Sequence, residues 1–228
     1  MAIELREKLV LLCEGEADKN FFTALISARN GLPKFDIPFP NKVDAATLHG
    51  SSAFGGMLRA IRGAGFDFKN IEGVLIVADS ATKPNDTFRT ICKQIRQPGG
   101  FPIPHTIDSV APRTEDHPAV AIKLLPALTK PGGLETLCVE ALSSMHPWLM
   151  KCVDEFLTCG GGKALTWSPE KQDKAKYAAM VAASNSKDPG KAVSRAFEGS
   201  SPLINPNHRT FDVVEAMILD FANTVGVT

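Results

Sequence analysis

Short runs of consecutive hydrophobic residues mark three places in the first part of the chain. They are Lys8–Cys13, Val74–Ala78 and Val120–Leu125. Continuous apolar runs of this length are typical of strands that are buried on both faces, as in a parallel sheet. Between and after them, apolar residues recur at helical spacing, which predicts helices near residues 17–29, 53–64, 86–97 and 134–142.

The order of these elements predicts an α/β fold with a mostly parallel sheet. Strands that alternate with helices form βαβ units, which place helices on both faces of the sheet, as in Rossmann-like proteins. A stretch rich in Pro, Asn and Gly from Asp36 to Ser52 predicts a loop. We expect an α/β domain at residues 1–145 and a helical C-terminal extension, packed on it, at 146–228.

Composition and charge exclude several classes of protein. Hydrophobic residues make up 44% of the 228 positions and charged residues 22%, which is ordinary for a folded domain and excludes a disordered chain. The 25 basic and 25 acidic side chains cancel, which removes the simplest argument for nucleic-acid binding but does not exclude it, because a local basic patch can act in a neutral protein. The five cysteines form no CxxC pair, which argues against zinc. No signal peptide or membrane-length apolar run is visible, so we expect a cytoplasmic protein.

Two acids follow predicted strands directly. Glu14 ends the first apolar run and Asp79 ends the second, and the carboxyl ends of parallel strands lie at one edge of a sheet. Asp18 follows Glu14 by one helical turn, so both could face one cation. Clustered carboxylates favour a hard divalent ion such as Mg²⁺ or Mn²⁺. The alternative is structural, because an acid at a helix start or strand end often caps a helix or turn.

Several segments resemble a known superfamily. LVLLCEGEADKNFF resembles the first motif of the Toprim nucleases and primases, a strand followed by Glu-Gly and a nearby acid, and VLIVADS resembles the second, a strand ending in Asp-x-Asp. VAIKLLPALTKPGGLETL, DKAKYAAM and DPGKAVSRAF resemble a Toprim-related family of uncharacterised bacterial proteins. The resemblance covers most of the chain and implies a Toprim-like fold.

The resemblance also implies roles for individual residues. The first-motif Glu, here Glu14, acts in the superfamily as general acid/base or metal ligand, and Asp79 matches the aspartate that holds Mg²⁺. Asp18 matches the second acid of the overcoming-lysogenization-defect nucleases, and Glu135 matches their downstream acid at a second metal. These implied metal ligands are Glu14, Asp18, Asp79 and Glu135.

A basic side chain could complete such a site. Lys174 and Lys176 are the candidates for stabilising charge on a phosphate. Of these two lysines we predict Lys174, so the predicted catalytic residues are Glu14, Asp79 and Lys174. No residue is assigned to an organic cofactor.

The sequence departs from the second motif at one position. Where the superfamily has a second aspartate, the chain reads Asp79-Ser80-Ala81, and Ala81 cannot bind a metal. Ser80 points to the other side if the strand continues, because side chains alternate along a strand. Asp86 is the nearby acid that could compensate.

The sequence supports three functional hypotheses. The first is a Toprim-like Mg²⁺-dependent nuclease that hydrolyses phosphodiester bonds, with a role in DNA processing or phage defence and an ATPase as partner. The second is a catalytically degenerate Toprim-fold protein that binds or regulates an ATPase or nucleic acid; the loss at Ala81 and the neutral net charge favour it. The third is a phosphotransfer enzyme acting on a small molecule. No membrane partner is expected.

Overall fold

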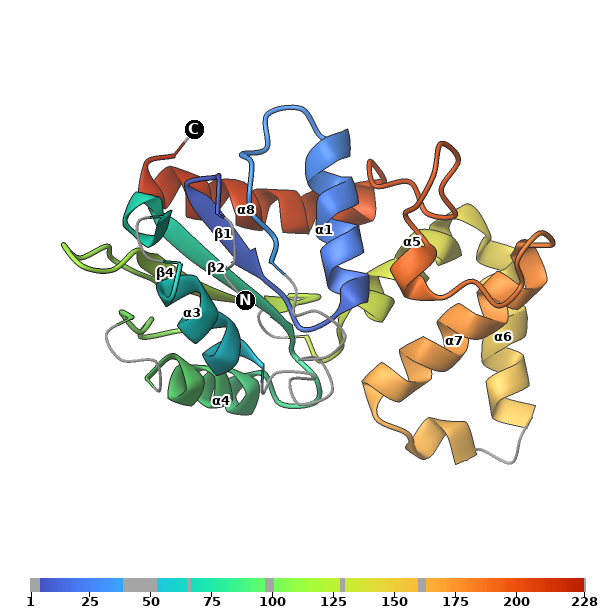
Figure 1. Ribbon diagram of the computed structural model, residues 1–228. Coiled ribbons are helices and arrows are strands. Elements are labelled where there is room, and N and C mark those ends of the chain that lie inside the picture. The colour runs from blue at the N-terminus through green and yellow to red at the C-terminus, as the bar shows by residue number, and fades with distance from the viewer. Residues whose placement is uncertain are drawn as a thin grey trace.

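The sheet lies at the centre of one half of the molecule (Figure 1). The computed structural model describes residues 5–38, 53–64, 67–96, 101–127, 130–159 and 163–227. Within them the strands follow the order β1-β2-β4-β3. Strands β1 (Leu9–Leu12), β2 (Gly73–Asp79) and β4 (Ala119–Leu125) are parallel, and β3 (Val110–Ala111) is an antiparallel edge strand. The α/β prediction with a mostly parallel sheet is confirmed.

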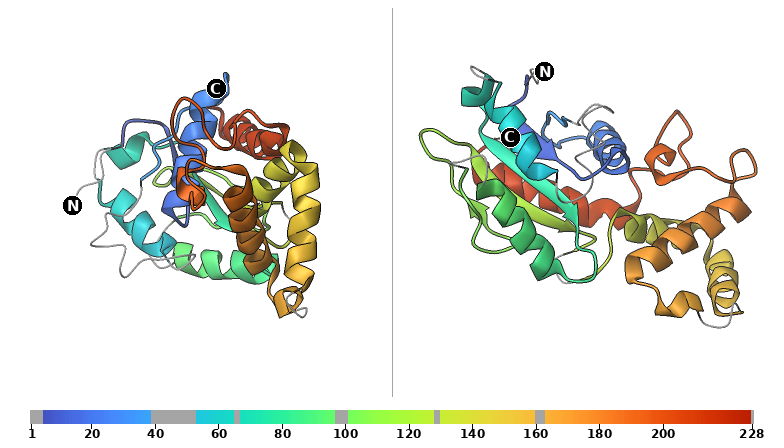
Figure 2. Two further views of the ribbon diagram at one scale, coloured as in Figure 1. Left: turned by 90° about the vertical axis from the view of Figure 1, so that its right-hand side faces the viewer. Right: turned by 60° about the horizontal axis from the view of Figure 1, so that its bottom comes forward.

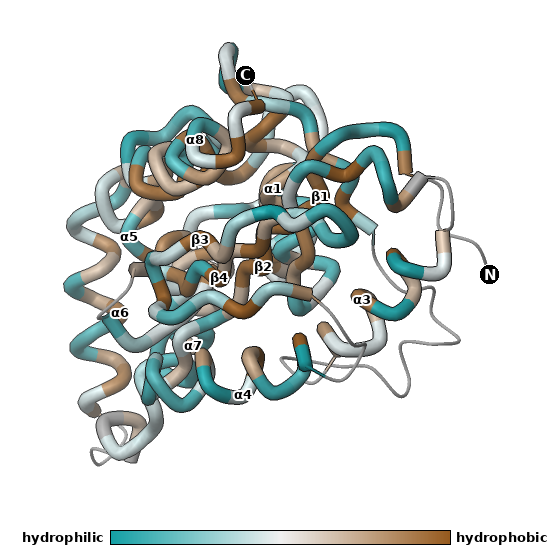
Figure 3. Tube along the Cα trace, turned by 90° about the vertical axis from the view of Figure 1, so that its left-hand side faces the viewer, coloured by the Kyte–Doolittle hydropathy of each residue, from teal (hydrophilic) through white to brown (hydrophobic). Residues whose placement is uncertain are grey.

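Helices cover both faces of the sheet. Alternate strand residues point to opposite faces, so Leu9, Leu11 and Leu75 join a core beneath α1 (Glu16–Ala28) and α8 (Asp212–Val225). The intervening residues join a separate core beneath α3 (Phe54–Arg62) and α4 (Pro84–Arg96). Figure 3 shows the hydrophobic strands between these two helical layers. This double burial explains why the strands read as continuous apolar runs.

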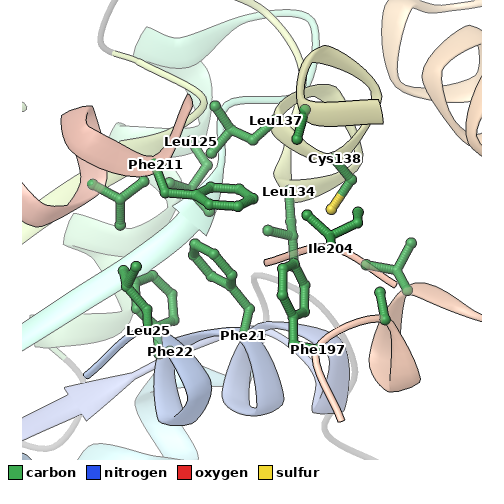
Figure 4. Close-up of a cluster of buried hydrophobic side chains, with 14 of the residues drawn as sticks. Phe21, Phe22, Leu25, Leu125, Leu134, Leu137, Cys138, Phe197, Ile204 and Phe211 are labelled. Carbon is green, nitrogen blue, oxygen red and sulfur yellow. The ribbon is translucent and has the colours of Figure 1, made fainter. Parts of the chain in front are cut away.

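The N-terminal helix packs against segments from the far end of the chain. Phe21 of α1 lies with its ring centroid 5.1 Å from that of Phe197 and 5.0 Å from that of Phe211, at tilted angles that aromatic pairs favour. Leu134 and Leu137 of α5 (Leu134–Met145) belong to the same cluster (Figure 4). The beginning of α1 and the beginning of α5 are therefore held in one hydrophobic core.

Helices α5, α6 (Pro147–Cys159) and α7 (Pro169–Ser184) form a lobe beside the sheet (Figures 1 and 2). The chain then returns and α8 crosses one face of the sheet, where the Phe221 ring would lie 2.7 Å from a Cβ added at Gly73. The part after residue 145 is thus helical, as predicted, and its last helix belongs to the sheet's own core. Short 3₁₀ helices complete the described elements, at Asp67–Asn70, Lys163–Thr166, Val193–Arg195 and Arg209–Phe211.

Some predictions differ from the structure in detail. Strand β3 was not predicted, because two residues are too short to give a hydrophobic pattern. Most of the loop predicted from Asp36 to Ser52 lies outside the described residues, but Asp36 itself extends the edge beside β1, where its backbone carbonyl accepts a 2.9 Å hydrogen bond from Leu11. Among the described helices, none combines the length and the apolar character needed to cross a bilayer.

Candidate functional site

Four acids gather beside the carboxyl ends of the strands. Glu14 lies two residues after β1, Asp18 lies in the first turn of α1, Asp79 ends β2, and Glu135 lies in the first turn of α5. The charges of the other three each raise the pKa of Asp79 through repulsion, which requires that they lie close to it. In Figure 1 the arrows of β1 and β2 point toward the side that carries α5 and α7.

Backbone N–H groups hold two of these carboxylates in place. Asp18 accepts a 2.9 Å hydrogen bond from the backbone of Gly15, the residue that precedes α1. Asp79 accepts a 3.1 Å hydrogen bond from the backbone of Leu134, the first residue of α5. Both acids therefore lie at helix N-termini, where the helix dipole favours negative charge. The structural roles considered from the sequence are therefore present for both aspartates.

The approach of Asp79 to α5 depends on a glycine. A Cβ atom added at Gly133 would lie 2.3 Å from Cγ of Asp79, closer than any side chain allows. Gly133 thus lets the end of β2 meet the start of α5. Through this contact, Asp79 and Glu135 belong to one cluster although they are far apart in the sequence.

Burial and mutual repulsion raise the pKa values of the acids. Desolvation, followed by the charge of Asp18, raises the pKa of Glu14 to about 7, although the backbone N–H of Asp79 partly favours its charged form. Desolvation is also the main cause that raises the pKa of Asp18 to about 6, against the opposing effect of its bond with Gly15. The pKa of Asp79 lies well above its ordinary value, through desolvation and then the charges of Asp18, Glu14 and Glu135.

One lysine lies beside the acids. The Lys174 ammonium, on α7, lies 3.9 Å from a carboxylate oxygen of Glu135 and pairs closely with Glu170, and its pKa is raised: burial lowers it, but these acids and Asp79 more than offset that effect. The other candidate, Lys176, pairs at 3.0 Å with Asp154 of α6. Of the two predicted lysines, Lys174 is the one beside the cluster.

Ala81, which stands where the second motif is expected to have an acid, is hydrogen-bonded to the loop before α5. Ala81 has a left-handed backbone, with φ of +50°, and exchanges two backbone hydrogen bonds with Gly132, at 3.0 and 2.8 Å. Ser80 is buried and donates a 2.6 Å hydrogen bond to the carbonyl of Lys130. Asp86 is exposed in the first turn of α4, 3.7 Å from Arg89, and is not among the charges that act on the clustered acids. No contact among the described residues therefore brings Asp86 into the acidic cluster.

A comparison with protein-family models places most of the chain in a family. The model described as "Protein of unknown function (DUF3226)" matches residues 8–223. The chain belongs to this family. The match runs from the residue before β1 into the last turns of α8, so it includes every residue of the acidic cluster. Searches of curated proteins and of solved structures gave no significant match.

For this DUF3226 chain, the fit to a metal ion is judged from the donor atoms. Carboxylate oxygens are the ligands that Mg²⁺ and Mn²⁺ prefer. In the described ranges, no three His, Cys, Asp or Glu side chains stand in a geometry that holds an ion. The donor atoms of the cluster are thus of the type that a hard divalent cation binds. Their side chains would have to move closer together before three of them could share one ion.

Two features of the site were missed from the sequence. Glu170 contributes a fifth charge, since it raises the pKa of Glu14 and pairs with Lys174; the four-residue spacing between Glu170 and Lys174 was a visible signal for that pair. A pocket of about 180 Å³ opens beside Glu135 and Lys174, lined further by Tyr177, Val181, Lys191 and their neighbours. No sequence signal marks this pocket, because it forms where α7 meets the segment at 189–193.

A second arrangement looks catalytic but is not poised for catalysis. The Ser144 hydroxyl lies 2.7 Å from Nε2 of His208, as in a nucleophile–base pair. However, Nδ1 of His208 accepts a hydrogen bond from the backbone N–H of Thr210, so in the neutral ring Nε2 carries the proton and donates to Ser144. Ser144 also donates to the carbonyl of Ala141. The pair thus ties the end of α5 to the segment before α8.

Proposed function

We propose that this protein is a Toprim-like, Mg²⁺- or Mn²⁺-dependent nuclease that hydrolyses phosphodiester bonds. The observation that carries the proposal is the convergence of Glu14, Asp18, Asp79 and Glu135, from four different parts of the fold, at the carboxyl edge of a parallel sheet. Ligand sites in open α/β sheets concentrate at that edge. Repelling carboxylates in a partly buried position are costly for stability, which favours a functional role.

The residues of the cluster suit the steps of hydrolysis. A bound divalent cation would neutralise charge on the scissile phosphate and lower the pKa of a water molecule. The pKa of Glu14 is about 7 without a metal. A cation bound beside it would lower that pKa, so Glu14 would be charged at neutral pH and could accept a proton from the attacking water. Lys174 lies where its ammonium could contact a phosphate oxygen as the P–O bond to the leaving oxygen breaks.

The pocket beside Glu135 and Lys174 supports a nucleotide substrate. It combines apolar lining from Tyr177 and Val181 with the lysines Lys174 and Lys191. Such a lining suits a base or sugar whose phosphate reaches the cluster. The Toprim resemblance further suggests DNA processing or phage defence in the cytoplasm, beside an ATPase partner.

A binding or regulatory protein without catalysis is the second candidate. Two observations favour it: Ala81 stands where the second motif has an acid and Asp86 is not part of the cluster, and the described side chains do not form a ready metal site. Under this hypothesis the acids would bind a cationic group of a partner protein or a metal without hydrolysis. The third hypothesis, phosphotransfer on a small molecule, uses the same acids and differs in substrate.

The deciding experiment is cleavage of plasmid and single-stranded DNA by the purified protein with Mg²⁺ or Mn²⁺. The variants Glu14→Gln and Asp79→Asn should each abolish cleavage. Asp79→Asn keeps an oxygen that can accept the hydrogen bond from Leu134, so it removes charge with little effect on the start of α5. The matched control is Asp86→Asn, an exposed acid outside the cluster, which should cut at the wild-type rate.

The possible results separate the three hypotheses. Metal-dependent cleavage that both cluster variants lose and the control keeps would support the nuclease. DNA or partner binding without cleavage, under both metals, would favour the binding protein. Turnover of nucleotides in place of oligonucleotides would favour the small-molecule enzyme.

A further inference from the structure

Helix α6 carries a hydrophobic stripe on its outer face. Trp148, Cys152, Phe156 and Cys159 recur at intervals of four, four and three residues, so they lie along one side of the helix. The side chains of Trp148 and Phe156 are 68% and 69% exposed, and both cysteines are exposed, free thiols. Exposed aromatic residues in a contiguous stripe mark interaction surfaces more often than isolated ones do.

This stripe lies directly beside the buried face of α6, because Phe156 follows Leu149 by seven residues and Val153 by three. Leu149 and Val153 are the buried residues of α6, and they belong to the main core. The side of α6 opposite the stripe carries Asp154, which pairs with Lys176 of α7. Figures 1 and 2 place α6 at the end of the molecule remote from α3 and the N-terminus, where another molecule can reach it. The apolar surface of α6 therefore continues from its buried face onto a stripe that the described residues leave exposed.

We propose that this stripe binds the same stripe of a second copy of the chain, with the two α6 helices antiparallel and a two-fold axis at Cys152. The stripe is symmetric about that residue, since Trp148 precedes it by four positions and Phe156 follows it by four. An antiparallel pair therefore brings Trp148 of each copy against Phe156 of the other. A two-fold interface requires this self-complementarity.

The charges beside the stripe favour the same arrangement. Lys151 and Glu155 are exposed and follow one flank of the stripe. In an antiparallel two-fold pair this flank lies on the same side in both copies, and Lys151 of one copy lies within about two residues, or ~3 Å along the axis, of the level of Glu155 of the other. In a parallel pair the two flanks lie on opposite sides, so neither lysine meets the glutamate.

The size of the surface sets the expected strength. One face of a 13-residue helix is smaller than a stable interface, which buries about 1,200–2,000 Å² in total. The dimer should therefore be reversible and depend on protein concentration. Sedimentation velocity over a concentration series should show a shift from monomer to dimer.

Cross-linking with the shortest bismaleimide tests the orientation. Cys152 lies on the proposed axis, whereas the two copies of Cys159, seven residues further on, would be about 20 Å apart along the helices. The remaining cysteines, Cys13, Cys92 and Cys138, are buried. Cross-linked dimer should form in Cys159→Ser and be lost in Cys152→Ser. Equal cross-linking through Cys159 would overturn the antiparallel arrangement.

Substitutions in the stripe test the interface itself. Phe156→Glu should abolish the dimer, while the control Val213→Lys, at an exposed apolar residue of α8, should keep it. Lys151→Glu should weaken dimerisation roughly fivefold through two lost surface ion pairs, and Lys151→Glu with Glu155→Lys should restore it. A protein that stays monomeric at every concentration, or a dimer that survives Phe156→Glu, would refute the proposal.

Discussion

Replacing Glu14 by Gln should stabilise the protein at pH 8 and change its stability little at pH 4. In the folded protein, desolvation and the charge of Asp18 raise the Glu14 pKa from 4.5 to about 7. The folded state thus holds this proton more tightly than the unfolded chain does. As pH rises from about 4.5 to 7, the unfolded chain loses the proton first, so the free energy of unfolding falls.

The magnitude comes from the same shift. Between 4.5 and about 7, at 1.36 kcal/mol per pKa unit, the loss is about 3 kcal/mol and is complete above the folded pKa. A Gln side chain carries no charge at any of these pH values, so the variant escapes the loss. Urea unfolding in EDTA should therefore give a larger free energy of unfolding for Glu14→Gln than for wild type at pH 8, by about 2–3 kcal/mol.

The control is Glu16→Gln, two residues further along and exposed in the first turn of α1. It should show no comparable gain at pH 8. If a divalent cation binds the cluster, adding Mg²⁺ at pH 8 should stabilise the wild-type protein more than it stabilises Glu14→Gln. The difference in the free energy of unfolding between the two proteins should then become smaller. A gain of equal size at pH 4 and pH 8, or a loss at pH 8, would show that the electrostatic reasoning is wrong.

Three further substitutions test features of the fold, two of them close to the cluster. Ala81→Gly should raise the free energy of unfolding by about 1 kcal/mol, measured in urea, because glycine adopts the left-handed φ of +50° without strain. Gly133→Ala should destabilise the protein by about 2–4 kcal/mol and lower any metal-dependent activity, since the new Cβ would displace Asp79. Arg29→Ala should lower stability by about 3–5 kcal/mol in the same assay, because the buried guanidinium pairs with Asp212 and Glu215. An unchanged free energy of unfolding in any of these variants would contradict the backbone angle or the contact on which that prediction is based.

The main strands could be predicted because their burial on both faces produces a run of hydrophobic residues in the sequence. Val74–Ala78 and Val120–Leu125 are hydrophobic almost without interruption since both faces of the sheet are covered. Strand β3 gives no such hydrophobic run, because it consists of only two residues, both paired with β4. A feature that depends on a few hydrogen bonds between distant segments cannot be read from hydrophobic pattern.

The candidate site shows the same division. The sequence could place Glu14 and Asp79 near each other because Glu14 lies two residues after one parallel strand and Asp79 ends the next. The position of Lys174 depends on how α7 packs against α5, which the sequence does not specify locally; the 2.6 Å hydrogen bond from Thr136 to Asp173 is one of the contacts that set it. The cap that Asp79 provides for α5 likewise appears only once Gly133 brings the two segments together.

The balance of charge around the cluster argues for a cationic ligand under either leading hypothesis. Lys174 is half exposed and shared between Glu135 and Glu170, so it offsets only part of the repulsion among the acids. The pKa of Asp79 stays raised despite its bond to the start of α5. A bound cation removes both the repulsion and the need to protonate, whether it is a metal ion in hydrolysis or a basic group of a partner. If a cation binds the cluster, the two hypotheses share that site and differ in whether a phosphodiester bond is broken. Cleavage therefore separates them, and binding of the cation alone does not.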